Sequence, residues 1–210
     1  MFPFESEGLC GYKDDKGTVV IEPIYLNAGV FCEGLAVVTG QNGKYGFIDM
    51  SGREVIPCVY FEAYDFNSGA ALVSLAAHID EDRWTYIDKQ GNRLTEKEFA
   101  LARNFSEDYA VVLKEGFGFP VPPRADIPKK WSFIDKSGHF ATELDFQDAR
   151  GFQNGYAWVK NNGKWGVADK AFNLVVAYQY DEIRALDNGS FSAKKGDVWV
   201  NTDFSGREIP

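Results

Sequence analysis

The sequence predicts an all-β fold, an array of about six three-stranded antiparallel β-repeats. Two observations carry this prediction. A short stretch of alternating apolar and polar residues ends in an aspartate, usually with a glycine three residues later, and the pattern recurs along the whole chain. The copies are 11–17, 46–52, 85–91, 132–138, 166–169 and 200–206. The array is either propeller-like, closed into a ring, or an open curved ribbon, because the spacing of the copies does not fix the rotation per repeat.

The first strand of each repeat, here called strand A, opens with an apolar or aromatic residue and ends at the aspartate. The openings are Cys10, Tyr45, Trp84, Trp131, Trp165 and Trp199. The aspartates are Asp14, Asp49, Asp88, Asp135, Asp169 and Asp203. We expect each aspartate to accept backbone N–H bonds in a type I turn whose glycine is left-handed. In the fifth repeat Asn173 is the residue nearby that suits this conformation, so we expect a turn one residue longer.

Strand B returns after the turn, for example at residues 53–57, and a seven-residue frame follows it. Apolar residues stand three apart in the frame, as at Tyr25, Ala28 and Phe31, a spacing that predicts a single tight helical turn. Strand C follows, for example at residues 35–38. A short turn, often Asn-Gly, then leads into the next strand A.

The aromatic residues that open strand A are predicted to form the core between repeats. A small isolated sheet is marginal in water, whereas a buried aromatic ring removes about 150–250 Å² from solvent. Stacking neighbouring repeats gains this burial. The predicted core residues are Tyr45, Trp84, Trp131, Trp165 and Trp199. The alternative is that these rings are exposed and stack on a ligand.

We predict one domain over residues 1–210. Its repeats lie near 1–24, 25–59, 60–98, 99–145, 146–179 and 180–210. The last repeat stops inside strand B, and the segment before the first strand A is left over. In a closed ring, this segment would supply the strand that the last repeat lacks.

Charge and composition limit the partners. Lys and Arg total 22 and Asp and Glu 31, a net charge of −9 at pH 7 that disfavours nucleic acid and anionic membranes. The N-terminus shows no basic segment followed by an apolar stretch, so we expect a cytoplasmic protein. Cys10, Cys32 and Cys58 form neither a disulfide framework nor a zinc pattern, and we expect no metal or cofactor.

Several motifs carry a family resemblance. Tyr45-Gly-Phe-Ile-Asp, Lys164-Trp-Gly-Val-Ala-Asp and Phe31-Cys-Glu-Gly-Leu-Ala resemble the bacterial WG-repeat (KWG) family, over essentially the whole chain. Some repeats depart from Trp-Gly, with Cys-Gly, Trp-Thr, Trp-Ser or Trp-Val in its place. The resemblance implies a β-repeat array that serves in protein interaction, and no reaction common to the family.

Two insertions mark the candidate binding surface. Successive openings of strand A are 35, 39, 47, 34 and 34 residues apart, and both longer intervals lengthen the turn between strands C and A. Equivalent turns lie on one rim of an array, so we expect the insertions to be neighbours there. The predicted partner-binding residues are Phe117, Phe119, Pro122, Arg124, Ile127, His78, Asp80 and Asp82. The alternative is that both insertions are tolerated surface loops.

No sequence motif points to an enzyme. The two histidines stand outside any metal-binding pattern, and nucleotide-binding glycine patterns and serine-nucleophile motifs are missing from the sequence. We therefore predict a non-enzymatic scaffold that binds a protein partner, of open identity and oligomeric state. The alternatives are an acidic immunity or inhibitor protein that neutralises a basic toxin or enzyme, and a carbohydrate-binding or hydrolytic propeller.

Overall fold

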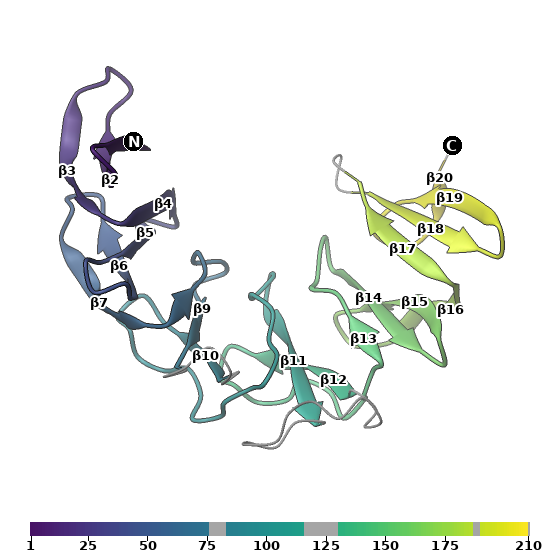
Figure 1. Ribbon diagram of the computed structural model, residues 1–210. Helices are drawn as coiled ribbons and strands as arrows, with labels where there is room; N and C mark the ends of the chain where they lie inside the picture. The colour runs from purple at the N-terminus through teal and green to yellow at the C-terminus, as the bar shows by residue number, and fades with distance from the viewer. Residues whose placement is uncertain (76–82, 116–129, 187–189, 210) are drawn as a thin grey trace. The chain divides into compact units, whose positions relative to one another are not determined.

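The computed structural model describes residues 1–75, 83–115, 130–186 and 190–209. All the regular elements in these segments are β-strands, which confirms the all-β prediction. The described segments hold no helix long and apolar enough to cross a membrane. The strands form six antiparallel sheets, which we number in chain order (Figure 1). The chain divides into unit 1, Met1–Phe105 with Lys136–Gly138, and unit 2, Ser106–Asp135 with His139–Pro210.

Unit 1 holds the first three sheets. The first sheet is ordered β1 (Phe2–Ser6), β2 (Leu9–Lys13), β3 (Val19–Tyr25). The second is ordered β4 (Asn27–Cys32), β5 (Leu35–Thr39), β6 (Tyr45–Asp49), β7 (Glu54–Tyr60). The third is ordered β8 (Glu62–Ala63), β9 (Ala71–Ser74), β10 (Trp84–Ile87).

Unit 2 holds the other three sheets. The fourth sheet pairs β11 (Tyr109–Glu115) with β12 (Lys130–Asp135). The fifth is ordered β13 (Asp148–Ala149), β14 (Tyr156–Asn161), β15 (Lys164–Asp169), β16 (Leu174–Tyr180). The sixth is ordered β17 (Glu182–Ala185), β18 (Phe191–Lys195), β19 (Val198–Thr202), β20 (Glu208–Ile209).

Part of the seven-residue frame forms a strand in four of the five frames, and the frame from Phe99 to Phe105 forms none. β4, β8, β13 and β17 come from it, and each pairs with strand C of its repeat, so the second, fifth and sixth sheets have four strands. The prediction of a helical turn was wrong: these segments are strands, and in the second sheet β4 bulges. Ala28 pairs with Val38 and Phe31 pairs with Ala36, which sets two frame residues against Val37 alone. The bulge turns the strand period of two into a spacing of three.

The N-terminal segment belongs to the first repeat. β1 pairs with β2 and aligns Glu5 with Cys10, as strand C aligns with strand A elsewhere. The expectation that this segment completes the last repeat is therefore wrong. The sixth sheet ends in β20, which pairs with β19.

The glycine after the opening residue of strand A is required by a close approach of strand B. A Cβ at Gly11, Gly46 or Gly166 would lie 2.4–2.6 Å from the carbonyl oxygen of Ile21, Ile56 or Val176, respectively. Strand B bulges opposite each glycine, and its backbone fills the space of a side chain. The glycine is therefore a packing requirement of the first, second and fifth sheets.

Thr85 and Ser132 replace this glycine in the third and fourth sheets. Both are completely buried. The Thr85 hydroxyl lies 3.4 and 3.3 Å from the carbonyl oxygens of Thr95 and Lys97, and the Ser132 hydroxyl donates to the Leu144 carbonyl at 3.1 Å. In these repeats the returning segment forms only isolated bridges to strand A, so it leaves room for a small polar side chain.

The six aspartates at the ends of strand A hold the turns that follow them. Asp49 shows the pattern: its carboxylate accepts the N–H groups of Ser51 and Arg53, and its backbone carbonyl accepts the N–H of Gly52. The carboxylates of Asp14, Asp88, Asp135, Asp169 and Asp203 also accept turn N–H groups. Hydrogen bonds to the carboxylate lower the pKa of Asp49, first from the Ser51 hydroxyl and then from the backbone.

The fifth repeat keeps the same turn length. Phe172 stands where the other turns have glycine; its φ is 62°, and its N–H donates to the Asp169 carbonyl at 2.8 Å. The expectation of a longer turn with a left-handed Asn173 was wrong. The Phe172 ring lies 5.3–5.8 Å from those of Tyr109, Phe133 and Phe152, and this packing compensates for the strained backbone.

Ring pairs join each of the first four repeats to the next. The third residue of strand A packs on the last aromatic residue of the following frame, with the same sequence separation in every pair. The pairs are Tyr12–Phe31, Phe47–Phe66 and Tyr86–Phe105 in unit 1 and Phe133–Phe152 in unit 2, at 4.8–5.2 Å between ring centroids. The buried Tyr12 and Tyr86 hydroxyls donate to the carbonyls of Gly29 and Arg103, and burial raises the pKa of both tyrosines.

Candidate interaction surface

The connections from strand C to strand A define one end of the sheets, which we call the C-to-A rim. These connections are short in the second, fifth and sixth sheets. The connections from β9 to β10 in unit 1 and from β11 to β12 in unit 2 are much longer. At the base of the first, the Leu75 N–H donates to the Arg83 carbonyl at 2.8 Å. Each unit therefore has one long connection at the same place in its repeat.

The predicted partner-binding residues all belong to these two connections. Phe117, Phe119, Pro122, Arg124, Ile127, His78, Asp80 and Asp82 lie outside the described residues. Their role stays a prediction.

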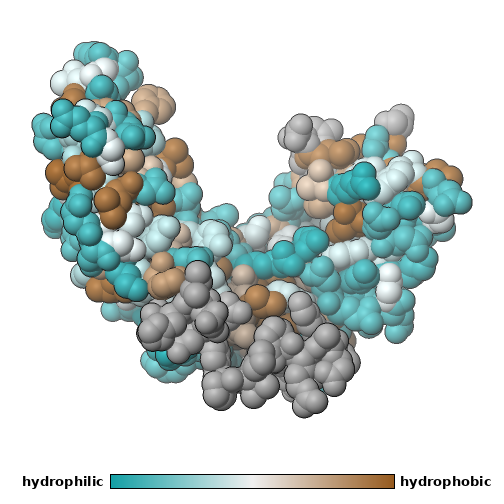
Figure 2. All heavy atoms as spheres, in the orientation of Figure 1, coloured by the Kyte–Doolittle hydropathy of each residue, from teal (hydrophilic) through white to brown (hydrophobic). Residues whose placement is uncertain are grey.

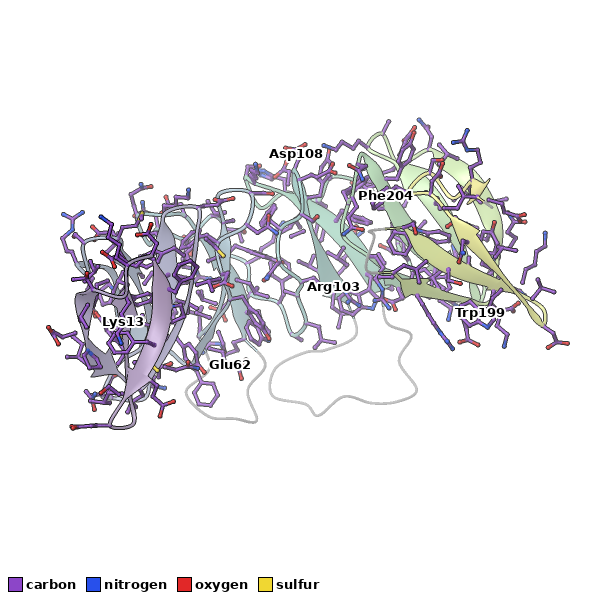
Figure 3. All side chains as sticks on the ribbon, turned by 90° about the horizontal axis from the view of Figure 1, so that it is seen from above. Lys13, Glu62, Arg103, Asp108, Trp199 and Phe204 are labelled. Carbon is purple, nitrogen blue, oxygen red and sulfur yellow. The ribbon has the colours of Figure 1, made fainter. Side chains whose placement is uncertain are left out.

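The aromatic residues that open strand A differ in burial. Trp131 and Trp165 are buried, whereas Tyr45, Trp84 and Trp199 are half-buried. Figure 3 shows Trp199 and Phe204 near opposite ends of β19, with Trp199 at the C-to-A rim.

Three of the tryptophan rings contact the same position of the frame. The Tyr64 ring lies 5.7 Å from Trp84, the Arg150 guanidinium 5.2 Å from Trp165, and the Arg184 guanidinium 4.1 Å from Trp199. A guanidinium or a second ring over an indole is itself a favourable contact. The chain thus supplies its own stacking partners for these three rings. The sequence alone had left open the alternative that a ligand stacks on them.

Exposed apolar side chains gather at the C-to-A rim of unit 1. Ile24 and Val59 are the second-last residues of β3 and β7, Leu26 follows β3, and Tyr64 follows β8. These four side chains are 53%, 61%, 46% and 46% exposed, respectively. Figure 2 shows apolar side chains among hydrophilic ones over β3 and β7. We call these four residues the apolar rim. Exposed apolar residues that gather in one place are typical of interaction surfaces.

At the corresponding rim of unit 2, polar side chains hold the short turns, and Val198 is 61% exposed there. Gln147 and Asp181 accept the N–H groups of Gly163 and Gly196 at 2.7 and 2.9 Å, and Asp181 also forms an ion pair with Lys164. Hydrogen bonds from Lys164 and then from Gly196 lower the pKa of Asp181.

The sequence analysis missed the apolar rim, although a signal was present. The residue after the opening aromatic of the frame is apolar in the first two frames, at Leu26 and Phe61. It is polar at Gln147 and Asp181.

Carboxylates tie neighbouring repeats together at the opposite end of the sheets. Glu33 accepts the N–H of Gly69 at 3.0 Å and forms an ion pair of 3.2 Å with Lys89. In unit 2, Glu107 accepts the N–H of Gly155 at 3.1 Å and pairs with Lys170 at 2.9 Å. Burial alone would raise the pKa of both carboxyls, but the hydrogen bonds from the lysines and the backbone lower it overall.

Across the described residues, no group of three or more His, Cys, Asp or Glu is placed to hold a metal ion. The three cysteines are free thiols, and burial raises the pKa of Cys58 to about 11. A thiol with this pKa is protonated at neutral pH and is a poor nucleophile.

A family model described as "WG containing repeat" matches residues 11–45, 45–75, 84–116, 131–165 and 165–199. A search of curated proteins returns no relative of the chain.

Solved structures with a similar fold include BamB from Moraxella catarrhalis, at 10% identity over 99% of this chain and 71% of that chain, with a TM-score of 0.50. The computationally designed Ika8 protein is 12% identical over 94% of this chain and 65% of that chain (TM-score 0.46). The Pan2 WD40 domain of Neurospora crassa is 15% identical over 97% of this chain and 74% of that chain (TM-score 0.46). The chain spans just under two thirds of the Ika8 chain. The likeness to BamB, a β-propeller, shows a propeller-like fold.

Proposed function

Because the chain belongs to the family of WG containing repeats, we propose that it is a protein-interaction scaffold without catalytic activity, which holds a protein partner at the C-to-A rim. The observation that carries the proposal is the shared position of the two long connections, one in each unit. In repeat proteins, insertions on one face commonly form the binding surface.

The packing within each unit suits this role. Ring pairs and the Glu33 and Glu107 carboxylates fix the first five repeats to their neighbours, so these repeats need to lose little conformational freedom when a partner binds at the rim. The apolar rim adds exposed apolar area at the C-to-A rim of unit 1. Phe117 and Phe119 are the aromatic anchors we propose for the second, with Arg124 setting orientation.

The test replaces a long connection with a short one from the same chain. Residues 116–129 are exchanged for the Asn161-Asn162-Gly163 turn that joins β14 to β15. We expect the thermal midpoint to stay nearly unchanged, because loop length has a small effect on stability. Capture of the partner from the native cell, measured by pull-down and mass spectrometry, is expected to be lost. The same exchange of residues 76–82 is the matched variant for the first connection. Equal loss of stability and capture would contradict the proposal.

A second candidate function is neutralisation of a basic toxin or enzyme, favoured by the net charge of −9. Electrostatic steering makes association with a cationic partner fast and strongly salt-dependent. Binding that collapses as salt rises, and that survives the exchange of residues 116–129, would support this candidate over the rim. We propose a reducing, cytoplasmic location for either function, which agrees with the three free thiols.

A further inference from the structure

Among the residues that the structure describes, no strand pairs with the outer edge of β1 in the first sheet. In the second, third, fifth and sixth sheets strand C lies between the frame strand and strand A. In the first sheet β1 takes the place of strand C, and it is the edge strand in the order β1-β2-β3. The rest of the chain therefore shows what occupies this position when it is filled, namely an extended antiparallel strand.

The backbone groups that hold the frame strand have counterparts in β1. The residue of strand C that aligns with the opening of strand A accepts an N–H from the frame. These bonds are Leu26 to Thr39, Phe61 to Ser74, Gln147 to Lys160 and Asp181 to Lys194, at 2.7–3.1 Å. Glu5 is the counterpart of these acceptors, because it aligns with Cys10. Its carbonyl is thus the first acceptor for an added strand.

Pro3 provides the second acceptor. It aligns with Tyr12, as Leu72 aligns with Tyr86, and the Leu72 carbonyl accepts the Tyr64 N–H at 3.0 Å. Pro3 has no N–H to donate, a property common in edge strands. Pro3 is the counterpart of Val37 in the second sheet, and β4 bulges opposite Val37. An added strand with the same bulge is compatible with Pro3.

The side chains of β1 select the occupant by charge. In the fifth and sixth sheets an acidic frame residue stands opposite a lysine of strand C, Asp148 opposite Lys160 and Glu182 opposite Lys194. The second pair forms an ion pair of 3.3 Å. Glu5, an exposed acid, takes the place of these lysines in β1. Opposite charges on facing residues stabilise strand pairing, so an added strand should carry a basic residue opposite Glu5.

The side chains also select by size. In the second sheet Phe31 of the frame lies opposite Ala36, which is completely buried. Phe2 is the counterpart of Ala36, and its side chain is 62% exposed. In the first sheet the bulky residue, Phe2, is on β1, so an added strand needs a small residue opposite it. In the frame strand the residues at these two positions, Asn27 and Phe31, are four apart, so the small residue should follow the basic residue by four positions.

We propose that the edge of β1 binds an extended, basic segment of a partner protein, which completes the first sheet as its fourth strand. A second copy of this chain fits less well, because it would bring another acidic strand with the same missing donor. The site belongs to the first sheet, from which neither long connection comes, and goes beyond the rim of the proposed function. Strand addition of this kind combines backbone hydrogen bonds with side-chain selection.

The test uses a peptide that copies the first frame of the chain. Residues 25–33 are synthesised with Asn27→Lys, Phe31→Ala and Cys32→Ser, and a matched peptide carries Asn27→Glu instead. Fluorescence anisotropy should show the lysine peptide binding about fivefold more tightly than the glutamate peptide. The Glu5→Lys protein, folded as judged by its thermal midpoint, should prefer the glutamate peptide. Hydrogen exchange at the Glu5 amide should slow when the lysine peptide binds.

Three results would overturn the proposal. One is failure of both peptides to bind, and another is a preference that Glu5→Lys leaves unchanged. The third is a dimer in light scattering whose β1 amides are protected without peptide, which would mean that a second copy occupies the edge. The protein with residues 116–129 exchanged should still bind the lysine peptide, so failure of the rim proposal is distinguishable from failure of this one.

Discussion

The carboxylate of Glu33 accepts the backbone N–H of Gly69 at 3.0 Å, across 36 positions of sequence. Glu107 makes the same bond to Gly155 in unit 2. In both cases a lysine from a later turn, Lys89 or Lys170, pairs with the same carboxylate. The turn between frame and strand C therefore carries a carboxylate that holds the next repeat in place, and this contact depends on pH.

We predict that acid weakens the fold partly through these two carboxylates. Their pKa is lower in the folded state than the usual value of about 4.3, so the stability they contribute is complete above that value. It is lost as the pH falls through the lower, folded pKa. In urea titrations at pH 7 and pH 3.5, the Glu33→Gln, Glu107→Gln protein should lose less free energy of unfolding than the wild type. Equal losses would contradict the prediction.

The substitution Gly46→Ala should destabilise the second sheet by about 1–3 kcal/mol. Its Cβ would lie 2.6 Å from the Ile56 carbonyl oxygen and 2.7 Å from the Cys58 nitrogen, both backbone atoms. Thr85→Ser is the matched control at the same place in the third sheet, where a side chain already fits, and it should cost much less. Chemical denaturation measures both. A cost for Gly46→Ala no larger than that of the control would mean that strand B can move away.

Removing the indole of Trp165 should cost about 3–5 kcal/mol, the usual range for a buried aromatic residue. The side chain is 5% exposed and lies in a cluster with Trp158, Val167 and Tyr180. Trp199→Ala should cost clearly less, because Trp199 is half-buried. A loss below about 1 kcal/mol for Trp165→Ala would place that ring at the surface and favour a ligand-stacking role.

The substitution Phe172→Gly separates backbone strain from packing. Glycine suits the φ of 62° and relieves strain of about 1 kcal/mol, but it removes the ring from Tyr109, Phe133 and Phe152. Since aromatic truncation in a core costs about 3–5 kcal/mol and Phe172 is only half-buried, we expect a net loss of about 1–2 kcal/mol. A lower thermal midpoint would agree with this. A higher one would show that strain dominates.

Strand A and its turn were predictable because their determinants are local. The alternation from Tyr45 to Asp49 and the carboxylate that caps its own turn depend on a few consecutive residues. Because small sheets need to bury apolar area, the sequence predicted that aromatic rings join the repeats. It did not predict which ring packs on which. Phe31 on Tyr12 is a contact between two repeats.

The remaining features depend on contacts that periodicity does not contain. In the second sheet, β4 has a spacing of three from Ala28 to Phe31 because it bulges opposite Val37, and a bulge is visible only once the partner strand is known. Phe172 adopts a left-handed backbone because rings from other strands stabilise it. The apolar rim is exposed at strand ends, where Ile24 and Val59 continue the same alternation that buries their neighbours. The role of the long connections stays a prediction.

The constant separation of the ring pairs also has a genetic consequence. Because Tyr12 with Phe31 and Phe47 with Phe66 each join strand A of one repeat to the frame of the next, a DNA segment one repeat long carries either one complete pair or half of two such pairs, depending on where it is cut. Duplication or excision of that segment restores complete pairs at the new junction. Arrays built this way can lengthen or shorten by recombination while each aromatic residue still meets a partner of the same kind.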